Sequence, residues 1–315
     1  MVWLPIIVQV TGVTILNLGT ILQKQGADEI PNVHNVPFLQ SVKNFITNKP
    51  WFIGYLAIML GTLLTFAVLG FADLSILQPF MGVGIIVQVI FCSWYLKEDV
   101  DKNDVVASMV ILVGVIFVGL SSREQDQEGF NDTMNMLVAP GALAFQLALL
   151  GFSVSCLLYT KWKSWKHADI WITVFSGINS VLSYLYMKVV FTALIEYGLS
   201  PALFINGTAW FMLFWAFIIS TVSFVSKQVA YQHGRAVLIN NIFNAFNIAL
   251  PVPVGIIVLG EWSDVTPLNG LLQLAGVLTI LIGVFFLMMH DMKQKRTCAM
   301  ETSNVSSEPI PRGEG

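Results

Sequence analysis

VLINNIFNAFNIALPVPVGIIVLGEWSDV, at residues 237–265, is an apolar stretch that matches a second one, ILQPFMGVGIIVQVIFCSWYLKEDV, at residues 76–100. Both stretches contain proline and share a Leu-x-Glu sequence near their ends. Each is followed by an apolar run centred on glycine, at 107–120 and at 278–287. The pairing predicts an internal repeat. The alternative is a chance likeness between apolar segments, which share their composition.

The composition is that of a membrane protein. The 315 residues are 56% hydrophobic and only 11% charged, with a mean hydropathy of +0.73. Soluble domains carry about 25% charged residues. The apolar runs have roughly the 18 to 25 residues with which a helix crosses about 30 Å of hydrocarbon. We therefore expect an all-α polytopic membrane protein with nine transmembrane helices, at roughly 2–22, 51–71, 74–96, 104–120, 138–160, 169–196, 207–231, 235–259 and 268–290.

Lysine and arginine are distributed unequally between the two sides of these nine spans. Thirteen fall on one side and Arg123 alone on the other, with Lys188 and Lys227 inside spans. Cytoplasmic loops carry the excess of basic residues. We therefore expect a cytoplasmic C-terminus and an N-terminus outside or in a lumen, with the choice of plasma membrane or endomembrane left open. The thirteen are Lys24, Lys43, Lys49, Lys97, Lys102, Lys161, Lys163, Lys166, Arg235, Lys293, Lys295, Arg296 and Arg312.

The spans divide into four, one and four. Residues 1–120 hold the first four, 138–160 forms a linker helix, and 169–290 holds the last four. Residues 291–315 are expected to form a disordered cytoplasmic tail. An odd linker makes the second half enter the membrane from the opposite face, which is the inverted-topology repeat of many secondary transporters.

The span at 235–259 is rich in asparagine. Asn240, Asn244 and Asn247 lie on one helical face at i, i+4 and i+7, and Asn241 flanks them. Amides are costly in hydrocarbon unless they are paired, so this face is expected to point into the bundle. We interpret the stripe as the wall of a substrate pathway. The alternative is that each amide serves only as interhelical hydrogen-bond glue.

Prolines interrupt the same span. Pro251 and Pro253 lie near its middle, and Pro79 occupies the corresponding place in the first repeat. Proline removes a backbone donor, which deprives the carbonyl of Asn247 of its usual partner. Free carbonyls at membrane depth are tolerated where they line a cavity, and broken helices of this kind build transport sites. We expect helix breaks at these prolines, although kinks that serve packing alone are the alternative.

Further polar residues lie at bundle depth. Lys188 is about two-thirds of the way through its span, and a charge at that depth is a candidate functional group. The alternative is a lysine that reaches the outer interface near Glu196. The remaining candidates for the substrate pathway offer neutral oxygens, and they are Asn17, Thr62, Thr65, Gln88 and Asn179.

At this point a family resemblance becomes specific. The run WFIGYLAIMLGTLLTFAVLGFADLSILQPFMGVGIIVQVIFCSWYLKEDV, at residues 51–100, resembles the NIPA magnesium-transporter family, a branch of the drug/metabolite transporter superfamily. That family has a Gly-Glu-x-x-Asn-Phe-x-Ala helix, a Pro-Leu-Gly-Ala helix and a Leu-Lys-Glu ending. ILQKQGAD looks like its Leu-Lys-Lys-Lys-Gly ending, and NMLVAPGALAF, the Lys188 helix and LGEW match in order and spacing. The resemblance covers about residues 2–290 and implies a drug/metabolite transporter-like fold.

The chain departs from the family pattern at two places. Thr62 and Thr65 stand where the family has an intramembrane Glu and Asn, and LINNIFNAFNIALPVP replaces a Pro-x-Tyr-Tyr-rich eighth helix. A lysine in the helix of Lys188 is a family feature, which implies a role in closing or stabilising the bundle. The resemblance thus supports the fold more strongly than the substrate.

Three functions follow from these observations. The leading hypothesis is a secondary transporter that moves a small cation by alternating access, with Mg²⁺ first through the resemblance; its metal ligands are unknown. The second is a transporter of an amine, amino acid or other metabolite, and the third is a non-transporting membrane scaffold.

We expect no enzyme, because the four histidines show no catalytic or metal-binding spacing, and no cofactor. Expected partners are an ion or small-molecule substrate and the lipid bilayer, with a homodimer left open; nucleic acid is excluded by a net charge of −3 without a basic block.

Overall fold

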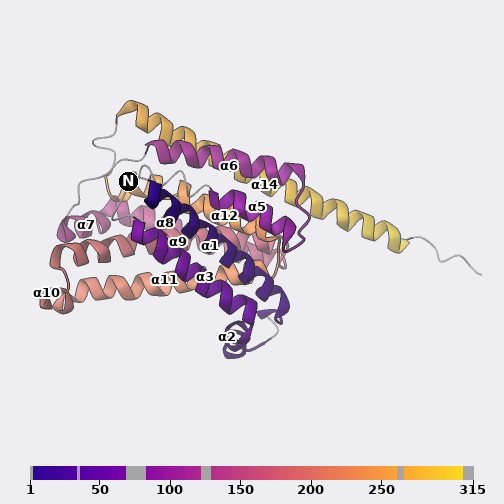
Figure 1. Cartoon of the computed structure of the whole chain (residues 1–315), viewed down its shortest axis with the longest axis horizontal. Helices are drawn as coiled ribbons and strands as arrows, with labels where there is room; N and C mark the ends of the chain where they lie inside the picture. The colour runs from indigo at the N-terminus through magenta and orange to yellow at the C-terminus, as the bar shows by residue number, and fades with distance from the viewer. Residues whose placement is uncertain (1–2, 34–35, 69–82, 122–128, 261–265, 308–315) are drawn as a thin grey trace, which may run out of the picture.

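The computed structural model of the chain describes residues 3–33, 36–68, 83–121, 129–260 and 266–307 (Figure 1). Every regular element within these ranges is a helix. The helices are α1 (Trp3–Glu29), α2 (Phe38–Thr47), α3 (Lys49–Val68), α5 (Val83–Trp94), α6 (Lys102–Ser121), α7 (Phe130–Leu137), α8 (Pro140–Trp162), α9 (Ala168–Tyr197), α10 (Pro201–Ile205), α11 (Gly207–Tyr231), α12 (Ala236–Ala249), α13 (Pro251–Val258) and α14 (Pro267–Ser307).

Six segments in the described part of the chain are long and apolar enough to cross a membrane. They are α6, α8, α9, α11, the α12–α13 pair and the first part of α14. Helices α3 and α5 are also apolar and contribute shorter described segments. The prediction of an all-α polytopic membrane protein is confirmed. Pro79, with the first part of the expected span at 74–96, lies outside the described residues.

Helix α14 is longer than the expected span at 268–290. It continues to Ser307, so residues 291–307, which were expected to belong to a disordered tail, are helical. The physical reason is in the sequence: DMKQKRTCAME is rich in good helix formers, and the first proline after Pro267 is Pro309.

Helices α12 and α13 form one span with an interruption in its middle. Helix α12 ends at Ala249 and α13 begins at Pro251, where the missing N–H of proline is least costly. Leu250 between them keeps helical dihedral angles, and its N–H donates to the carbonyl of Phe246 (3.0 Å). The chain therefore continues in nearly the same direction but with a weakened backbone ladder at this point.

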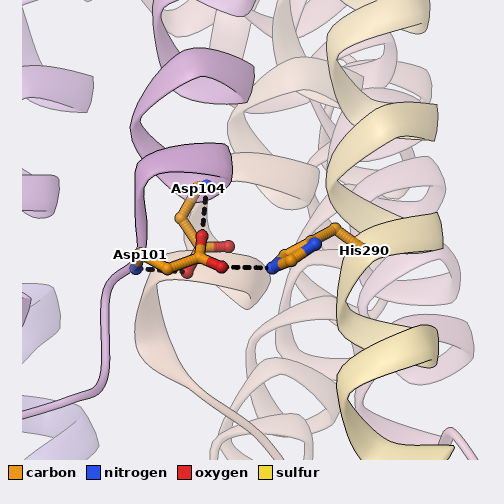
Figure 2. Close-up of side chains that lie close together, drawn as sticks. All are labelled: Asp101, Asp104 and His290. Carbon is orange, nitrogen blue, oxygen red and sulfur yellow. Dashed lines mark hydrogen bonds and ion pairs between the residues drawn. The ribbon is translucent and has the colours of Figure 1, made fainter.

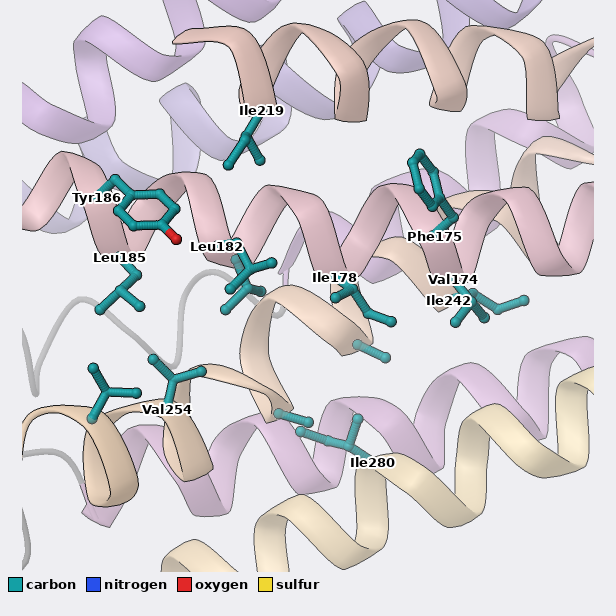
Figure 3. Close-up of a cluster of buried hydrophobic side chains, with 14 of the residues drawn as sticks. Val174, Phe175, Ile178, Leu182, Leu185, Tyr186, Ile219, Ile242, Val254 and Ile280 are labelled. Carbon is teal, nitrogen blue, oxygen red and sulfur yellow. The ribbon is translucent and has the colours of Figure 1, made fainter. Parts of the chain in front are cut away.

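Helix α9 is the most buried of the candidate spans and lies at the centre of the bundle. Its residues Val174, Ile178 and Leu182 are buried and pack with side chains from α11, α12, α13 and α14 (Figure 3). Burial on nearly every face of a helix requires an apolar or small side chain at almost every position. The stretch ITVFSGINSVLSYL meets that requirement, which explains why this helix occupies the core.

Small residues bring three helix pairs into close contact. On α1 and α3, a Cβ atom added to Gly19 would lie 2.6 Å from the carbonyl oxygen of Gly54. On α6 and α14, a Cβ added to Gly276 would lie 2.8 Å from the carbonyl oxygen of Gly114. On α9 and α11, the hydroxyl of Ser176 donates to the carbonyl of Ser223 (2.7 Å). Such contacts between small residues are a common means by which membrane helices associate.

The contact between α6 and α14 gives a direct test of this packing. We expect Gly276→Val to lower the stability of the purified protein by about 1–3 kcal/mol, because the added side chain must push the α6 backbone away. The same substitution at Gly151 is the matched control, since nothing lies within 4 Å of a Cβ added there. Melting in detergent measures both variants, and equal shifts for the two would contradict the assigned packing.

Candidate functional site

One end of the bundle collects the helix termini that carry most of the basic residues, and we call it the basic face. Helices α1 and α11 end there, and α3, α6 and α12 begin there. The Nζ of Lys24 donates to the carbonyl of Tyr231 (2.6 Å), and the Nε1 of Trp51 donates to the Oε1 of Gln228 (2.8 Å). Figure 1 shows α2 and the C-terminal part of α14 at this end, and α7 and α10 at the other. The helix ends predicted to be cytoplasmic therefore share one face.

Three amides on three helices, two of them buried and one half-buried, form a chain of hydrogen bonds inside the bundle. The Nε2 of Gln88 on α5 donates to the Oδ1 of Asn17 on α1 (2.6 Å). The Nδ2 of Asn244 on α12 donates to the Oε1 of Gln88 (3.3 Å). We call these residues the amide seam. Gln88 and Asn17 are 1% and 5% exposed, so the seam lies within the protein and not on its lipid-facing surface.

Glycine makes room for the seam. A Cβ atom added to Gly84 on α5 would lie 2.3 Å from the Nδ2 of Asn17, closer than side chains tolerate. Gly84 therefore lets the Asn17 amide lie flat against α5, where its oxygen reaches Gln88. Gly84 and Gln88 are four residues apart and so lie on the same face of that helix.

The other asparagines of α12 bind to different neighbours. The Nδ2 of Asn241 donates to the hydroxyl of Ser108 on α6 (2.8 Å). The Oδ1 of Asn247 accepts from the hydroxyl of Ser180 on α9 (2.8 Å). The Oδ1 of Asn240 accepts from the hydroxyl of Tyr231 on α11 (2.5 Å). The asparagine stripe thus joins α12 to several helices, and only Asn244 belongs to the amide seam.

Within the described part of the chain, four buried amide atoms on α1 and α12 have no hydrogen-bond partner. On α12 they are the Nδ2 of Asn240 and the Oδ1 of Asn241, and on α1 they are the Oε1 of Gln9 and the Nε2 of Gln23. A buried polar atom without a partner is costly and usually marks a place for water or an ion. Helices α1 and α12 therefore each have polar atoms available to bind a polar species.

The side chains of two remaining neutral candidates form hydrogen bonds within their own helices. The hydroxyl of Thr65 donates to the carbonyl of Thr62 one turn earlier (2.8 Å), and the Nδ2 of Asn179 donates to the carbonyl of Phe175 (2.8 Å). These bonds remain within α3 and within α9. Within the described ranges, no hydrogen bond joins Thr62, Thr65 or Asn179 to the amide seam.

Lys188 and Pro251 line one pocket of about 180 Å³ between α9 and α13. Lys188 is exposed at its rim, and the other lining groups are largely apolar. Pro253 is half-buried on α13. None of the pocket-lining residues belongs to the amide seam. The structure therefore separates Lys188 from the amides with which the sequence grouped it.

A buried ion-pair cluster that was not predicted from the sequence lies at the basic face. Arg235, just before α12, donates to Asp104 on α6 (2.6 Å) and to Asp291 on α14 (3.1 Å). Both acids are buried, at 0% and 1% exposure. Burial opposes the charge of Arg235, but the two carboxylates outweigh it and raise its pKa above the usual value. The cluster ties three helices together.

Glu98 anchors the same end of α12. Its carboxylate accepts from the backbone N–H groups of Ala236 (2.6 Å) and Val237 (3.2 Å), which begin the helix. A carboxylate at this position stabilises a helix through the free N–H groups and the helix dipole. Burial nevertheless raises the pKa of Glu98 above its usual value. Glu98 closes the Leu-Lys-Glu sequence, which gives that motif a structural role.

Asp101, Asp104 and His290 lie close enough together to resemble a metal site (Figure 2). Each group already has a partner: Asp101 pairs with His290 (2.5 Å), and Asp104 pairs with Arg235. Partial burial raises the pKa of Asp101, but the Asp104 N–H and His290 outweigh it, so this pKa lies below its usual value. We therefore describe these residues as part of the ion-pair cluster.

Removal of the arginine tests the cluster. We expect Arg235→Met to lower stability by about 3 kcal/mol or more, because two buried carboxylates lose their counter-charge. Adding Asp104→Asn and Asp291→Asn to this variant should recover part of the loss. Lys161→Met, at an exposed lysine of the same face, is the control and should change little. A triple variant that melts below Arg235→Met in detergent would contradict the electrostatic account.

The fold and these buried polar groups define a polytopic membrane protein whose helices are joined by amides and ions as well as by apolar packing. The family described as magnesium transporter NIPA matches residues 3–295. The chain belongs to this family, and it is a membrane transporter and not an enzyme. This assignment favours transport over a purely structural scaffold.

Individual relatives are distant in sequence but similar in extent. The chain is 27% identical to the probable magnesium transporter NIPA9 of Arabidopsis thaliana, over 86% of this chain and 78% of that protein. It is 23% identical to the probable magnesium transporter NIPA1 of Arabidopsis thaliana, over 81% of this chain and 76% of that protein. It is 21% identical to the human magnesium transporter NIPA3, over 98% of this chain and 75% of that protein. No solved structure matches the chain.

Proposed function

We propose that this chain carries Mg²⁺ across a membrane by alternating access. Its family and the named relatives support Mg²⁺ as the cargo. The observation that carries the proposal for the pathway is the amide seam, which joins Asn17, Gln88 and Asn244 of three helices in one chain of hydrogen bonds inside the bundle. Neutral amides in the membrane interior do not repel a cation, and their oxygens can bind its water shell.

The chemistry of Mg²⁺ suits a pathway of this kind. Mg²⁺ gives up its water reluctantly and usually keeps several water ligands when proteins bind it. Water molecules bound to Mg²⁺ donate hydrogen bonds, and the oxygens of Asn17 and Gln88 already accept from neighbouring amides. Each water molecule of a hydrated Mg²⁺ would take the place of one amide N–H as the donor to these oxygens. The Oδ1 of Asn241 on α12 and the Oε1 of Gln9 on α1, which accept no hydrogen bond from the described residues, are further acceptors on two of the three helices that form the seam.

We propose nine spans arranged as two inverted repeats of four on either side of α8, with the basic face in the cytoplasm. Corresponding helix pairs support the repeat: α1 contacts α3 and α5 in the first half, and α9 contacts α11 and α12 in the second. Helices α6 and α14, the last of each half, pack against each other through Gly114 and Gly276. The excess of lysine and arginine at the basic face supports the orientation.

One end of α12 is held firmly to its neighbours, whereas the other end has a weakened backbone ladder at which it can bend. This difference supports alternating access. At the basic face, Glu98 and Arg235 hold the helix to neighbouring elements. At its other end, Pro251 weakens the backbone ladder next to Leu250. We propose that opening toward the cytoplasm breaks the ion pairs of Arg235, while the α12–α13 junction bends.

Substitution of the seam tests the pathway. We expect Asn244→Leu and Gln88→Leu each to reduce Mg²⁺ uptake at least about tenfold, since each removes an oxygen from the seam and adds apolar bulk. Uptake is measured in sealed vesicles with a fluorescent Mg²⁺ indicator and divided by the amount of folded protein. Asn247→Leu is the matched control, because it removes an α12 amide that lies outside the seam. Equal losses in all three variants would contradict a specific role for the seam.

A carboxylate in the seam tests the nature of the cargo. We expect Asn244→Asp to lower the KM for Mg²⁺, because carboxylates are the protein ligands that Mg²⁺ prefers. Asn179→Asp places the same charge on α9 outside the seam and is the control. A raised KM in Asn244→Asp alone, or unchanged kinetics in both variants, would argue against a hard divalent cation at this position.

A further inference from the structure

Lys227 is buried inside the bundle, unlike the exposed Lys188. Lys227 lies on α11, one turn before its end at Tyr231, and is only 8% exposed. Among the residues that the structure describes, no carboxylate is within ion-pair distance of its ammonium group. The other buried lysine, Lys24, differs in this respect, because its Nζ binds Asp28 (2.5 Å).

Aromatic rings hold the Lys227 ammonium in place of a carboxylate. Its Nζ lies 4.0 Å from the centre of the Phe243 ring and 5.6 Å from the centre of the Tyr231 ring. The faces of aromatic rings attract cations, and the attraction is stronger where water is excluded. The space in front of these two rings is therefore a cation position, and the chain fills it with its own ammonium.

This cation position adjoins the amide seam. Phe243 directly precedes Asn244 on α12. The hydroxyl of Tyr231 donates to Asn240, which lies on α12 one turn before Asn244. Among the described residues, the Nδ2 of Asn240 has no hydrogen-bond partner. Lys227 thus lies beside the part of α12 that bears both a seam residue and unused polar capacity. An ammonium there and a passing Mg²⁺ would repel each other in a medium of low dielectric constant.

We propose that Lys227 is a specificity-determining residue whose ammonium acts as a tethered cation beside the pathway and is displaced when Mg²⁺ passes. The inference rests on the proposed function. Lysine has a flexible stem of four methylene groups, and the basic face is about one helical turn away, so the ammonium can leave the rings and reach water. The Lys227 ammonium carries one positive charge and competes with the cargo. A cation must therefore carry more than one charge to displace it.

Substitutions that separate charge from volume test this role. We expect Lys227→Met to lower the KM for Mg²⁺ by on the order of tenfold, because it keeps the unbranched shape but removes the repulsion. Lys227→Arg keeps the charge and should leave the KM close to that of the unaltered protein. The matched control is Lys163→Met, at an exposed lysine whose Nζ lies 4.8 Å from the ring centre of Trp162. It should leave the KM unchanged.

Replacing the tethered ammonium with a free one gives a second test. The free cation would not change the KM for Mg²⁺ if Lys227 had a purely structural role. Lys227→Ala removes the stem beyond Cβ, and n-propylammonium matches the atoms removed. We expect n-propylammonium to raise the KM for Mg²⁺ of Lys227→Ala toward that of the unaltered protein and to have no effect on the unaltered protein. Propanol, which is neutral and of similar size, should have no effect on either.

The outcomes distinguish this inference from the proposed function. If vesicles with the unaltered protein take up no Mg²⁺, the proposed function fails. If they do, but Lys227→Met keeps an unchanged KM and n-propylammonium does not affect Lys227→Ala, then only the tethered-cation role is overturned. If Lys227→Met folds poorly, the comparison of Lys227→Ala with and without n-propylammonium still decides the question.

Discussion

The need of buried amides for hydrogen-bond partners in hydrocarbon is the constraint on which this structure depends. Helix α12 carries more amides than an apolar span tolerates unless they are paired. It pairs them outward, through Asn244 to α5, Asn241 to α6, Asn247 to α9 and Asn240 to α11. A rotation of α12 about its axis would break all four bonds together. These amides thereby fix the position of the helix in the bundle and also place polar atoms at its centre.

Small residues complement this polar framework. Glycine and serine contacts hold α1 to α3, α6 to α14 and α9 to α11. The bundle thus combines firmly packed helix pairs with one helix that polar bonds attach to several neighbours. Hydrogen bonds between membrane helices contribute only about 0.6 to 2 kcal/mol each. We propose that a helix held by several such bonds exchanges them for bonds to a hydrated ion during transport.

The sequence could predict the class of element and the helices that carry polar groups, but not the pairing between distant residues. The spacing of Asn240, Asn244 and Asn247 predicted that they share one face of a helix, but it did not predict their partners, which come from three other helices. Arg235 was counted only among the basic residues of one side, because nothing local relates it to Asp104 and Asp291, which lie far away in the chain. Lys188 and Lys227 look alike as lysines within spans, and only burial distinguishes the exposed one from the one held by aromatic rings. The end of α14 was misjudged because polar helix formers were interpreted as disorder.

The central claim is that a bundle without a carboxylate in its amide seam moves Mg²⁺. Metal-resolved uptake by sealed vesicles that contain only the purified chain tests this claim most directly, with empty vesicles as the reference and Ca²⁺ and an organic amine offered in parallel. The account predicts saturable uptake of Mg²⁺ above the reference. Folded protein that takes up the amine and no Mg²⁺, or that takes up neither, would contradict it.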